Sequence, residues 1–364
     1  MLITGLQFKH ITRNVVQKIA GVSVGVIGGY HGGNLGDMAL GESVANILRE
    51  QKIKTGLQTI YNLEKWPLAP FAIVGGGAVG YADSLIRVAK RYKGNYNKVA
   101  LLGVDYNEKT YEGECLELIK NAAYLSCRSE AQAERMMLIS GRKDITFHPD
   151  IAFSLYREFC AKNRKQIKDK QNKILLVNLI PLYGKLENGK MIPSAQYKDE
   201  RPELYESFDQ MHISYRKYVR EVVSKALSEG YVVETIPFTP QDDEFGQFIL
   251  EGLNVKHTPY HSDPLKMIRH MATAGTILAT RYHATIFAIK LGIPLFPVAY
   301  AVKNELLLED LGVPRTQFHS TVDLANGKEN LSDAINVDEK SVNKYELRSN
   351  TAINAAITAL NINN

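Results

Sequence analysis

Cysteine is scarce in this chain of 364 residues, and its spacing indicates neither a metal site nor a disulfide framework. The three cysteines, Cys115, Cys127 and Cys160, are an odd number, and none forms a Cys-x-x-Cys pair. Such usage is typical of reduced thiols in a cytoplasmic protein. No Asp-x-Asp pair occurs either, so a metal-dependent nucleotide-sugar site of the A-type glycosyltransferase kind has no support. We therefore expect neither a metal nor a cofactor.

Long apolar runs and concentrated charge are missing as well. No stretch reaches the roughly 18 apolar residues of a membrane span, and the N-terminus lacks the pattern of a secretory signal. Residues 2–19 have apolar side chains near helical spacing, which predicts a helix packed on the first domain rather than on a membrane. The 44 basic and 39 acidic residues leave a net charge of +5, spread along the chain. This excess suits an anionic substrate or a peripheral association with the inner face of the cell membrane, and it falls short of a nucleic-acid footprint.

The sequence does contain a regular alternation of short apolar strands with helices of about 10 to 14 residues, which is the signature of parallel, doubly wound sheets. We predict an α/β protein with two Rossmann-like domains, 1–165 and 170–364, that face each other across a cleft, as in B-type glycosyltransferases. A polar, lysine-rich segment at 156–172 is the expected linker. We expect 181–210 to be a long irregular loop that shapes an acceptor site, and a last helix near 342–360 to pack back on the first domain.

Two glycine-rich turns follow predicted strands in the first half. Residues 23–50 read as a strand, a glycine-dense loop and a helix that begins near Met38 behind an N-cap at Asp37. The glycines of this loop match neither a dinucleotide nor a P-loop spacing, so they allow close backbone approach to a ligand without specifying one. A second glycine turn lies within 71–92, and the two turns would border one crevice. The structural alternative is that the glycines serve only for turning. The candidate residues on this side are His31, Asn34, Asp37, Gly76 and Gly77.

A strand, a turn, a helix and a second strand are predicted over residues 276–303. Arg281 and His283 fall at the N-terminus of the helix, and Lys303 opens the next helix. Positive charge, helix N-terminal N–H donors and a group that titrates near neutral pH are what an anion needs if it must also exchange a proton. The structural alternative is a salt-bridged strand end with a buried, hydrogen-bonded histidine.

A series of short motifs in order, spanning residues 24 to about 312, resembles the polysaccharide pyruvyl transferase family. Each motif alone is weak, and their order and spacing together are fairly specific. The motifs are Gly29-Tyr30, Gly33 to Asp37, Val74 to Gly77, Cys127 to Glu130, Pro149-Asp150, Ile236 to Phe238 before Asp242-Asp243, Arg281 to Ala284, Gly292 to Pro294 and Tyr300 to Lys303.

The resemblance implies a B-type glycosyltransferase-like fold, phosphoenolpyruvate as donor and a sugar hydroxyl as acceptor. The products would be pyruvate ketals, or related pyruvyl groups, on surface polysaccharides, secondary cell-wall polymers or their lipid-linked precursors. One departure is visible, because this chain has Tyr282 where the family commonly has leucine.

Phosphoenolpyruvate carries a phosphate and a carboxylate, so its site should offer two or more cations and backbone donors. We expect Arg128 and Arg281 to hold an oxyanion bidentately, Lys303 to act as a point charge, and His283 to serve with Arg281 as the catalytic pair, with His283 as the general acid/base. For Arg128 the alternative is an ion pair with Glu130 or a capping role.

Two rival functions stay open from the sequence. The first is a B-type glycosyltransferase with a nucleotide-sugar donor, which would need a nucleotide pocket in the second domain. The second is a non-catalytic paralogue that binds carbohydrate or anions without turnover. The acceptor in the leading interpretation is a sugar or a lipid-linked oligosaccharide.

Overall fold

The computed structural model describes residues 13, 15–17, 21–105, 111–167, 172–195, 198, 205–328 and 333–362. By their contacts the residues group into two compact units, Met1–Tyr156 with Lys344–Asn364, and Arg157–Asn343. The helix expected over 2–19 falls almost wholly outside the described residues, of which 13 and 15–17 are helical.

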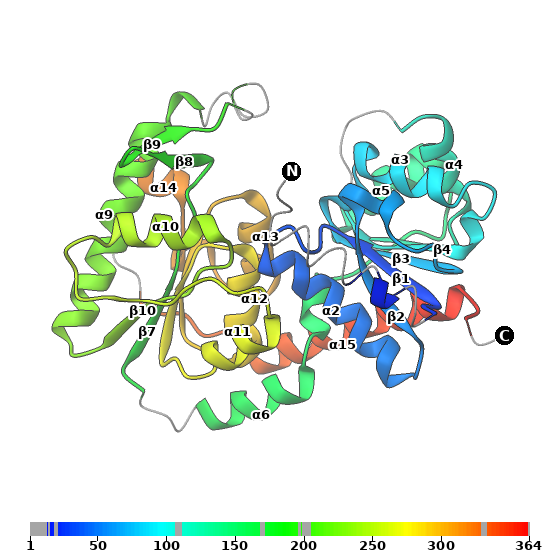
Figure 1. Ribbon diagram of the computed structural model, residues 1–364. Coiled ribbons are helices and arrows are strands. Elements are labelled where there is room, and N and C mark those ends of the chain that lie inside the picture. The colour runs from blue at the N-terminus through cyan, green and yellow to red at the C-terminus, as the bar shows by residue number, and fades with distance from the viewer. Residues whose placement is uncertain are drawn as a thin grey trace. The chain divides into compact units, whose positions relative to one another are not determined.

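The first unit is built on a six-stranded sheet in which every pairing is parallel (Figure 1). The strand order is β2-β1-β3-β4-β5-β6. Its strands are β1 (Val24–Gly28), β2 (Thr55–Thr59), β3 (Phe71–Gly77), β4 (Val99–Val104), β5 (Tyr124–Cys127) and β6 (Thr146–Phe147).

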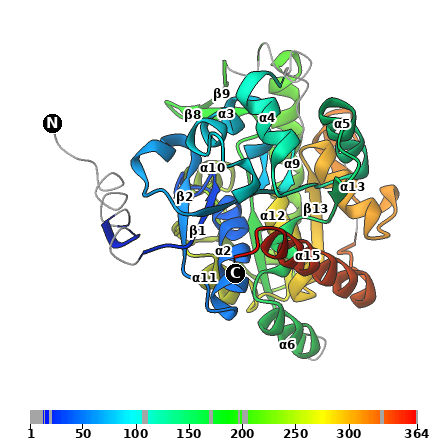
Figure 2. The ribbon, with the colours of Figure 1, turned by 90° about the vertical axis from the view of Figure 1, so that its right-hand side faces the viewer.

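Helices cover both faces of this sheet. One face packs against α3 (Ala82–Arg91), α4 (Gly113–Asn121) and α5 (Glu130–Ser140), whose apolar side chains join those of the strands in one core. The other face carries α2 (Leu35–Glu50). The last helix, α15 (Glu339–Ala359), lies next to α2 in both views, and Gln51 donates a hydrogen bond to Asn354 at 2.8 Å (Figures 1 and 2). The 3₁₀ turns are η1 (Ile60–Lys65), η2 (Ala78–Gly80), η3 (Tyr96–Lys98) and η4 (Ile151–Ser154).

The second unit has a second six-stranded parallel sheet, with the order β11-β10-β7-β12-β13-β14. Its strands are β7 (Ile174–Asn178), β10 (Val232–Thr235), β11 (Lys256–His257), β12 (Thr276–Ala279), β13 (Leu295–Ala299) and β14 (His319–Ser320). Counted along the chain within this unit, the order is 3-2-1-4-5-6, that of dinucleotide-binding sheets.

Helices also flank the second sheet. The helices α9 (Phe208–Ser228), α10 (Pro240–Ile249) and α14 (Thr321–Ala325) share a core with one face. On the other side α12 (Tyr282–Leu291) packs between the sheet, α6 (Arg157–Ile167) and α11 (Pro264–Met271). The remaining elements are α13 (Val302–Asp310), the 3₁₀ turn η5 (Arg315–Gln317) and an antiparallel hairpin of β8 (Gly184–Glu187) and β9 (Lys190–Pro193).

The predicted α/β class with two parallel sheets is confirmed, and two local predictions, the start of the first long helix and the irregular course of 181–210, are wrong. Helix α2 begins at Leu35, and its N-cap is Asn34 rather than Asp37. Most of the expected linker is helix α6, and the expected irregular loop contains the hairpin.

Each sheet has one place where the chain reverses the direction in which it adds strands. We call this place the switch point of the sheet. It lies between β1 and β3 in the first sheet and between β7 and β12 in the second. The loops that leave the carboxyl ends of such a strand pair diverge to opposite faces, so a ligand can enter between them. Both positions fall on motifs singled out in the sequence.

Candidate functional site

Arg281 follows directly after the switch point of the second sheet. Its backbone N–H donates to the side-chain oxygen of Asn178, at the end of β7, at 2.9 Å. The backbone N–H of Thr280 donates to the Asn178 carbonyl at 3.1 Å, and the Asn304 amide donates to the Thr280 carbonyl at 3.3 Å. Asn178 and Asn304 therefore fix the turn that carries Arg281, and neither was identified from the sequence.

The Arg281 guanidinium forms a two-pronged ion pair with Asp242. Nε donates to Oδ2 at 2.6 Å and Nη2 to Oδ1 at 2.5 Å, and Nη2 also donates to the Thr239 hydroxyl at 3.1 Å. The Asp242 side chain is fully buried and closes the capping box at the start of α10. The salt-bridged strand end foreseen as an alternative is thus present, and Asp242 balances the charge of Arg281.

Lys303 lies between two aromatic rings. Its Nζ is 5.2 Å from the centroid of the Tyr282 ring and 5.5 Å from that of Tyr300, which is within range of cation–π attraction. The Tyr183 hydroxyl donates to the Tyr300 carbonyl at 2.8 Å. Among the described residues, no carboxylate lies within ion-pair distance of this ammonium. Lys303 is therefore a cation held by aromatic rings and not balanced by an acid.

His283 lies in the first turn of α12, with its ring 5.4 Å from the ring of Tyr282 and 6.5 Å from that of Phe287. Arg281 is the N-cap residue of this helix, and its side chain caps no N–H group. The first turn of α12, with its N–H donors, thus carries the His283 imidazole and the Tyr282 ring, and the Lys303 ammonium lies over that ring. We name Tyr183, Tyr282, His283, Tyr300 and Lys303 the switch-point cluster.

A cavity of about 260 Å³ opens at the switch point of the first sheet. It contains two of the residues selected from the sequence, Asp37 and Gly76. Burial and the Asp37 carboxylate raise the pKa of the Tyr61 hydroxyl, which therefore stays protonated at neutral pH. The lining residues are Gly29, Asp37, Leu40, Tyr61, Gly75, Gly76, Val79, Tyr81, Asp83 and Ser84. We name this the glycine-turn pocket.

Two other selected residues, Asn34 and His31, do not line this pocket. The Asn34 side chain accepts from the Gly36 N–H at 2.9 Å as the cap of α2. His31 is buried against Trp66, with ring centroids 5.7 Å apart, and its Nδ1 is 2.7 Å from an Arg13 nitrogen. Gly77 pairs with Val104 inside the sheet.

Arg128 is paired with two aspartates, Asp105 and Asp150, and not with Glu130, the partner that the sequence suggested as an alternative. Its Nε donates to Asp105 at 2.7 Å, Nη2 also bonds Asp105, and Nη1 donates to Asp150 at 3.1 Å. Asp150 in turn caps η4. Arg128 thus joins the ends of β4 and β5 to η4, and the two carboxylates balance its charge.

Within the described ranges, no three His, Cys, Asp or Glu side chains gather as metal ligands would. In the same ranges no helix combines the length and apolar character that crossing a bilayer requires.

Comparison with known families identifies the family of this chain. The family model described as polysaccharide pyruvyl transferase matches residues 34–301, well over half of the chain. The chain belongs to the polysaccharide pyruvyl transferase family. It is therefore a transferase enzyme, and the family named from its motifs is confirmed. No curated protein sequence matches it.

One solved structure supports the fold of this transferase, and a second is reported with it. UDP-GlcNAc 2-epimerase from Neisseria meningitidis, bound to UDP-GlcNAc, is 11% identical with a TM-score of 0.50, and the match covers 94% of this chain and 99% of the epimerase. A protein described as a UDP-N-acetylglucosamine 2-epimerase from Listeria monocytogenes is 12% identical with a TM-score of 0.49, covering 92% and 94%. At such identities the likeness concerns the fold alone, and the predicted pair of Rossmann-like units of the B-type glycosyltransferase kind is confirmed.

The family match contains the switch point of the second sheet, and in the first sheet it begins after β1 and includes β3. It includes the lining residues of the glycine-turn pocket except Gly29, as well as Arg128, Arg281 and His283, and it ends two residues before Lys303. From the sequence, Asp242, the partner of Arg281, was named only as part of a family motif, and no ion pair was predicted for it. Asp242 is the third residue of α10, behind the N-cap Thr239, and the Thr-Pro-x-Asp spacing is a capping-box signal that indicates a helix start.

Proposed function

We propose that the protein transfers the pyruvyl group of phosphoenolpyruvate to hydroxyls of a sugar in a cell-surface polysaccharide or its precursor, forming a pyruvate ketal. The observation that carries this proposal is that Lys303 and His283 both lie near the Tyr282 ring, at the switch point of the second sheet. An unbalanced cation, a proton-exchanging group and a helix N-terminus meet there, which is what this donor requires.

Donor binding would depend chiefly on Lys303 and the first N–H groups of α12. The Nε and Nη2 groups of Arg281 could bind an oxyanion together, but both already donate to Asp242. Arg128 is balanced in the same way by Asp105 and Asp150. The ion pair with Asp242 would hold Arg281 in place, so the charge of Lys303 and the amide dipoles supply most of the attraction for the phosphate and carboxylate.

His283 would supply the proton that the donor needs. Protonation of the methylene carbon gives a methyl group, and a sugar hydroxyl oxygen bonds to the central carbon and loses its proton. Phosphate then leaves with the bonding electron pair of its C–O bond. A second hydroxyl of the same sugar bonds to the same carbon and releases a proton, which completes the ketal. An imidazole can give the first of these protons and take up one of the others.

The glycine-turn pocket would bind the acceptor sugar. Its tyrosine rings can cover the apolar face of a sugar, and its carboxylates and hydroxyls can bond sugar hydroxyls. A Cβ placed at Gly29 would lie 3.2 Å from an Asp37 carboxylate oxygen and 3.6 Å from the Tyr61 hydroxyl. The glycine thus leaves room in which a ligand can reach both groups.

The proposal is tested by incubating the protein with phosphoenolpyruvate and a panel of oligosaccharide and lipid-linked acceptors. Mass spectrometry should show a gain of one pyruvyl unit, with phosphate released in equal amount. His283→Gln should lower this rate by about a hundredfold to ten thousandfold, and the matched variant His261→Gln should leave it unchanged. Gly29→Ala should raise the KM for the acceptor alone. Full activity of His283→Gln would exclude the role given to His283.

A further inference from the structure

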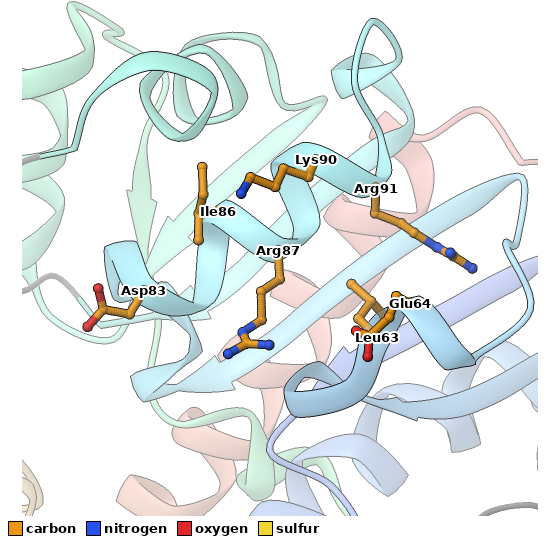
Figure 3. Close-up of a pocket in the computed structure, with 7 residues that line it drawn as sticks. All are labelled: Leu63, Glu64, Asp83, Ile86, Arg87, Lys90 and Arg91. Carbon is orange, nitrogen blue, oxygen red and sulfur yellow. The ribbon is translucent and has the colours of Figure 1, made fainter.

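A second cavity of the first unit, of about 500 Å³, lies between α3 and η1. Figure 3 shows Arg87, Lys90 and Arg91 along the helix, with Asp83 at its N-terminal end and Leu63 and Glu64 on the facing segment. The lining is completed by Ile86. Three cations against two carboxylates make this cavity, which we name the α3 groove, positively charged.

Among the residues that the structure describes, the three cations of the α3 groove have no ion-pair partner. Across the described ranges, no carboxylate lies within ion-pair distance of any of them, although Lys93 and Arg142 of the same unit both have such partners. Arg87 instead donates to the backbone carbonyl of Tyr61 at 3.1 Å, and Arg91 donates to that of Trp66. Bonds to neutral carbonyls orient the guanidinium groups without cancelling their charge, and each guanidinium has five N–H donors.

The α3 groove and the glycine-turn pocket adjoin each other along the same two elements. Asp83 lines both cavities, and so do residues of η1, with Tyr61 on one side and Leu63 and Glu64 on the other. Because a helix rises about 1.5 Å per residue, Arg87 and Arg91 lie roughly 6 and 12 Å along α3 from Asp83. A ligand that begins in the pocket beside Asp83 can therefore continue past all three cations.

We propose that the α3 groove binds a phosphate or diphosphate group attached to the acceptor sugar, so that the substrate is a phosphate-bearing saccharide. This assignment rests on the proposed function, which places the sugar in the glycine-turn pocket. Arginine forks match phosphate oxygens, and a row of unbalanced cations suits two linked phosphates better than one carboxylate. Glu64 and Asp83 bound the groove and would disfavour an anion that is not held by the arginines.

The test measures binding without turnover, by calorimetry with inorganic pyrophosphate at about 0.1 M salt, where long-range attraction is screened. The triple variant Arg87→Gln, Lys90→Gln, Arg91→Gln should bind at least about tenfold more weakly than the natural chain, a loss of about 1.4 kcal/mol. The matched control Lys98→Gln, Arg135→Gln, Lys143→Gln removes the same charge from exposed sites of the same unit and should bind as the natural chain does. Thermal unfolding of each variant confirms that it is folded.

Equal binding by the two triple variants, or no binding by the natural chain, would overturn the assignment. Glucose 1-phosphate and glucose, compared by ligand-observed NMR, form a second arm, in which only the phosphorylated sugar should respond to the α3 variant. Vesicles of phosphatidylglycerol form a third. If the α3 residues governed vesicle binding and not pyrophosphate binding, the groove would belong to a membrane surface and the assignment would be wrong. None of these measurements includes phosphoenolpyruvate, so failure of pyruvyl transfer and failure of phosphate binding are separate results.

Discussion

Among single residues of the proposed donor site, Lys303 differs from Arg281 because two aromatic rings rather than an acid lie next to its charge. Two of the three cations selected as donor ligands, Arg128 and Arg281, are balanced by aspartates. A ring face attracts an ammonium group through its quadrupole and leaves its net charge available to an anion. The tyrosine at 282, which departs from the leucine expected for the family, thus has a physical role.

Tyr282→Leu should weaken donor binding more than it slows the chemistry. Loss of one ring next to Lys303 removes a cation–π contact of about 0.5 to 2 kcal/mol, so the KM for phosphoenolpyruvate should rise by roughly 2-fold to 30-fold. Tyr282→Phe retains the ring and should stay close to the natural chain. Steady-state kinetics separate KM from kcat, and an unchanged KM in Tyr282→Leu would show that the ring does not position Lys303.

Asp242→Asn should destabilise the second unit by about 3 kcal/mol, because it breaks a buried ion pair and leaves Arg281 without its counter-charge. The carboxylate also accepts from the N–H groups of Phe238 and Thr239 at 3.0 Å, and an amide cannot satisfy all of these donors. Urea unfolding gives the change in free energy. Glu244→Gln makes the same charge change on an exposed position of the same helix and should stay within about 0.5 kcal/mol. Similar values for both variants would contradict the account.

The residue positions of the site could be read from the sequence, and their partners could not. Arg281 and His283 stood out because a cation and a histidine follow a buried strand. That Arg281 pairs with Asp242 depends on how β12 and α10 meet, which requires the strand order. One signal was present and missed, because Gly75, Gly77 and Gly80 have the Gly-x-Gly-x-x-Gly spacing across the end of β3 and η2, where the glycine-turn pocket opens.

Helices and strands that have a strong hydrophobic periodicity, or glycines at their ends, were predicted. Those that depend on tertiary contacts were not. The hairpin β8–β9 turns at Asn188 and Gly189, both with positive φ, and an Asn-Gly pair is a strong hairpin signal that the surrounding prolines obscured. Helix α6 looks like a linker by composition. It packs because buried Arg164 bonds the Lys290 carbonyl and the Asn343 side chain, beside Gly292, where a Cβ would lie 3.0 Å away.

The edge of the first sheet carries a pH-dependent element. Burial and the nearby Arg348 charge lower the pKa of His148 to about 4, from an ordinary value near 6.5. Tyr124 and Thr146 bond its Nε2, at 2.8 and 3.1 Å. Because the folded protein disfavours the charged imidazole, the contribution of this group to stability is complete above about pH 6.5 and is lost as the pH falls toward 4.

His148→Gln should therefore reduce the fall in stability between about pH 7 and about pH 5, whatever its effect at neutral pH. Arg348→Gln removes the repelling charge, so it should raise the pKa of His148 and also make the fall smaller. The midpoints of urea unfolding at the two pH values give the comparison. If both variants lost as much stability on acidification as the natural chain, another group would control this transition.

For the whole molecule, two sheets with separate cores make two unfolding transitions the reasonable expectation, so ligands can be assigned to units by the transition that they move. Phosphoenolpyruvate at about 100 times its dissociation constant should stabilise the transition of the second unit by roughly 2.7 kcal/mol. For a unit of this size that is a rise in Tm of about 5 to 10 °C.

UDP-GlcNAc, the ligand of the Neisseria meningitidis epimerase, should leave both transitions unchanged. Lys303→Gln should abolish the response to phosphoenolpyruvate, while Lys256→Gln, which removes a lysine paired with Glu234 elsewhere in the unit, should retain it. Stabilisation by UDP-GlcNAc together with no response to phosphoenolpyruvate would instead support a nucleotide-sugar donor, because a ligand stabilises only the folded unit that binds it.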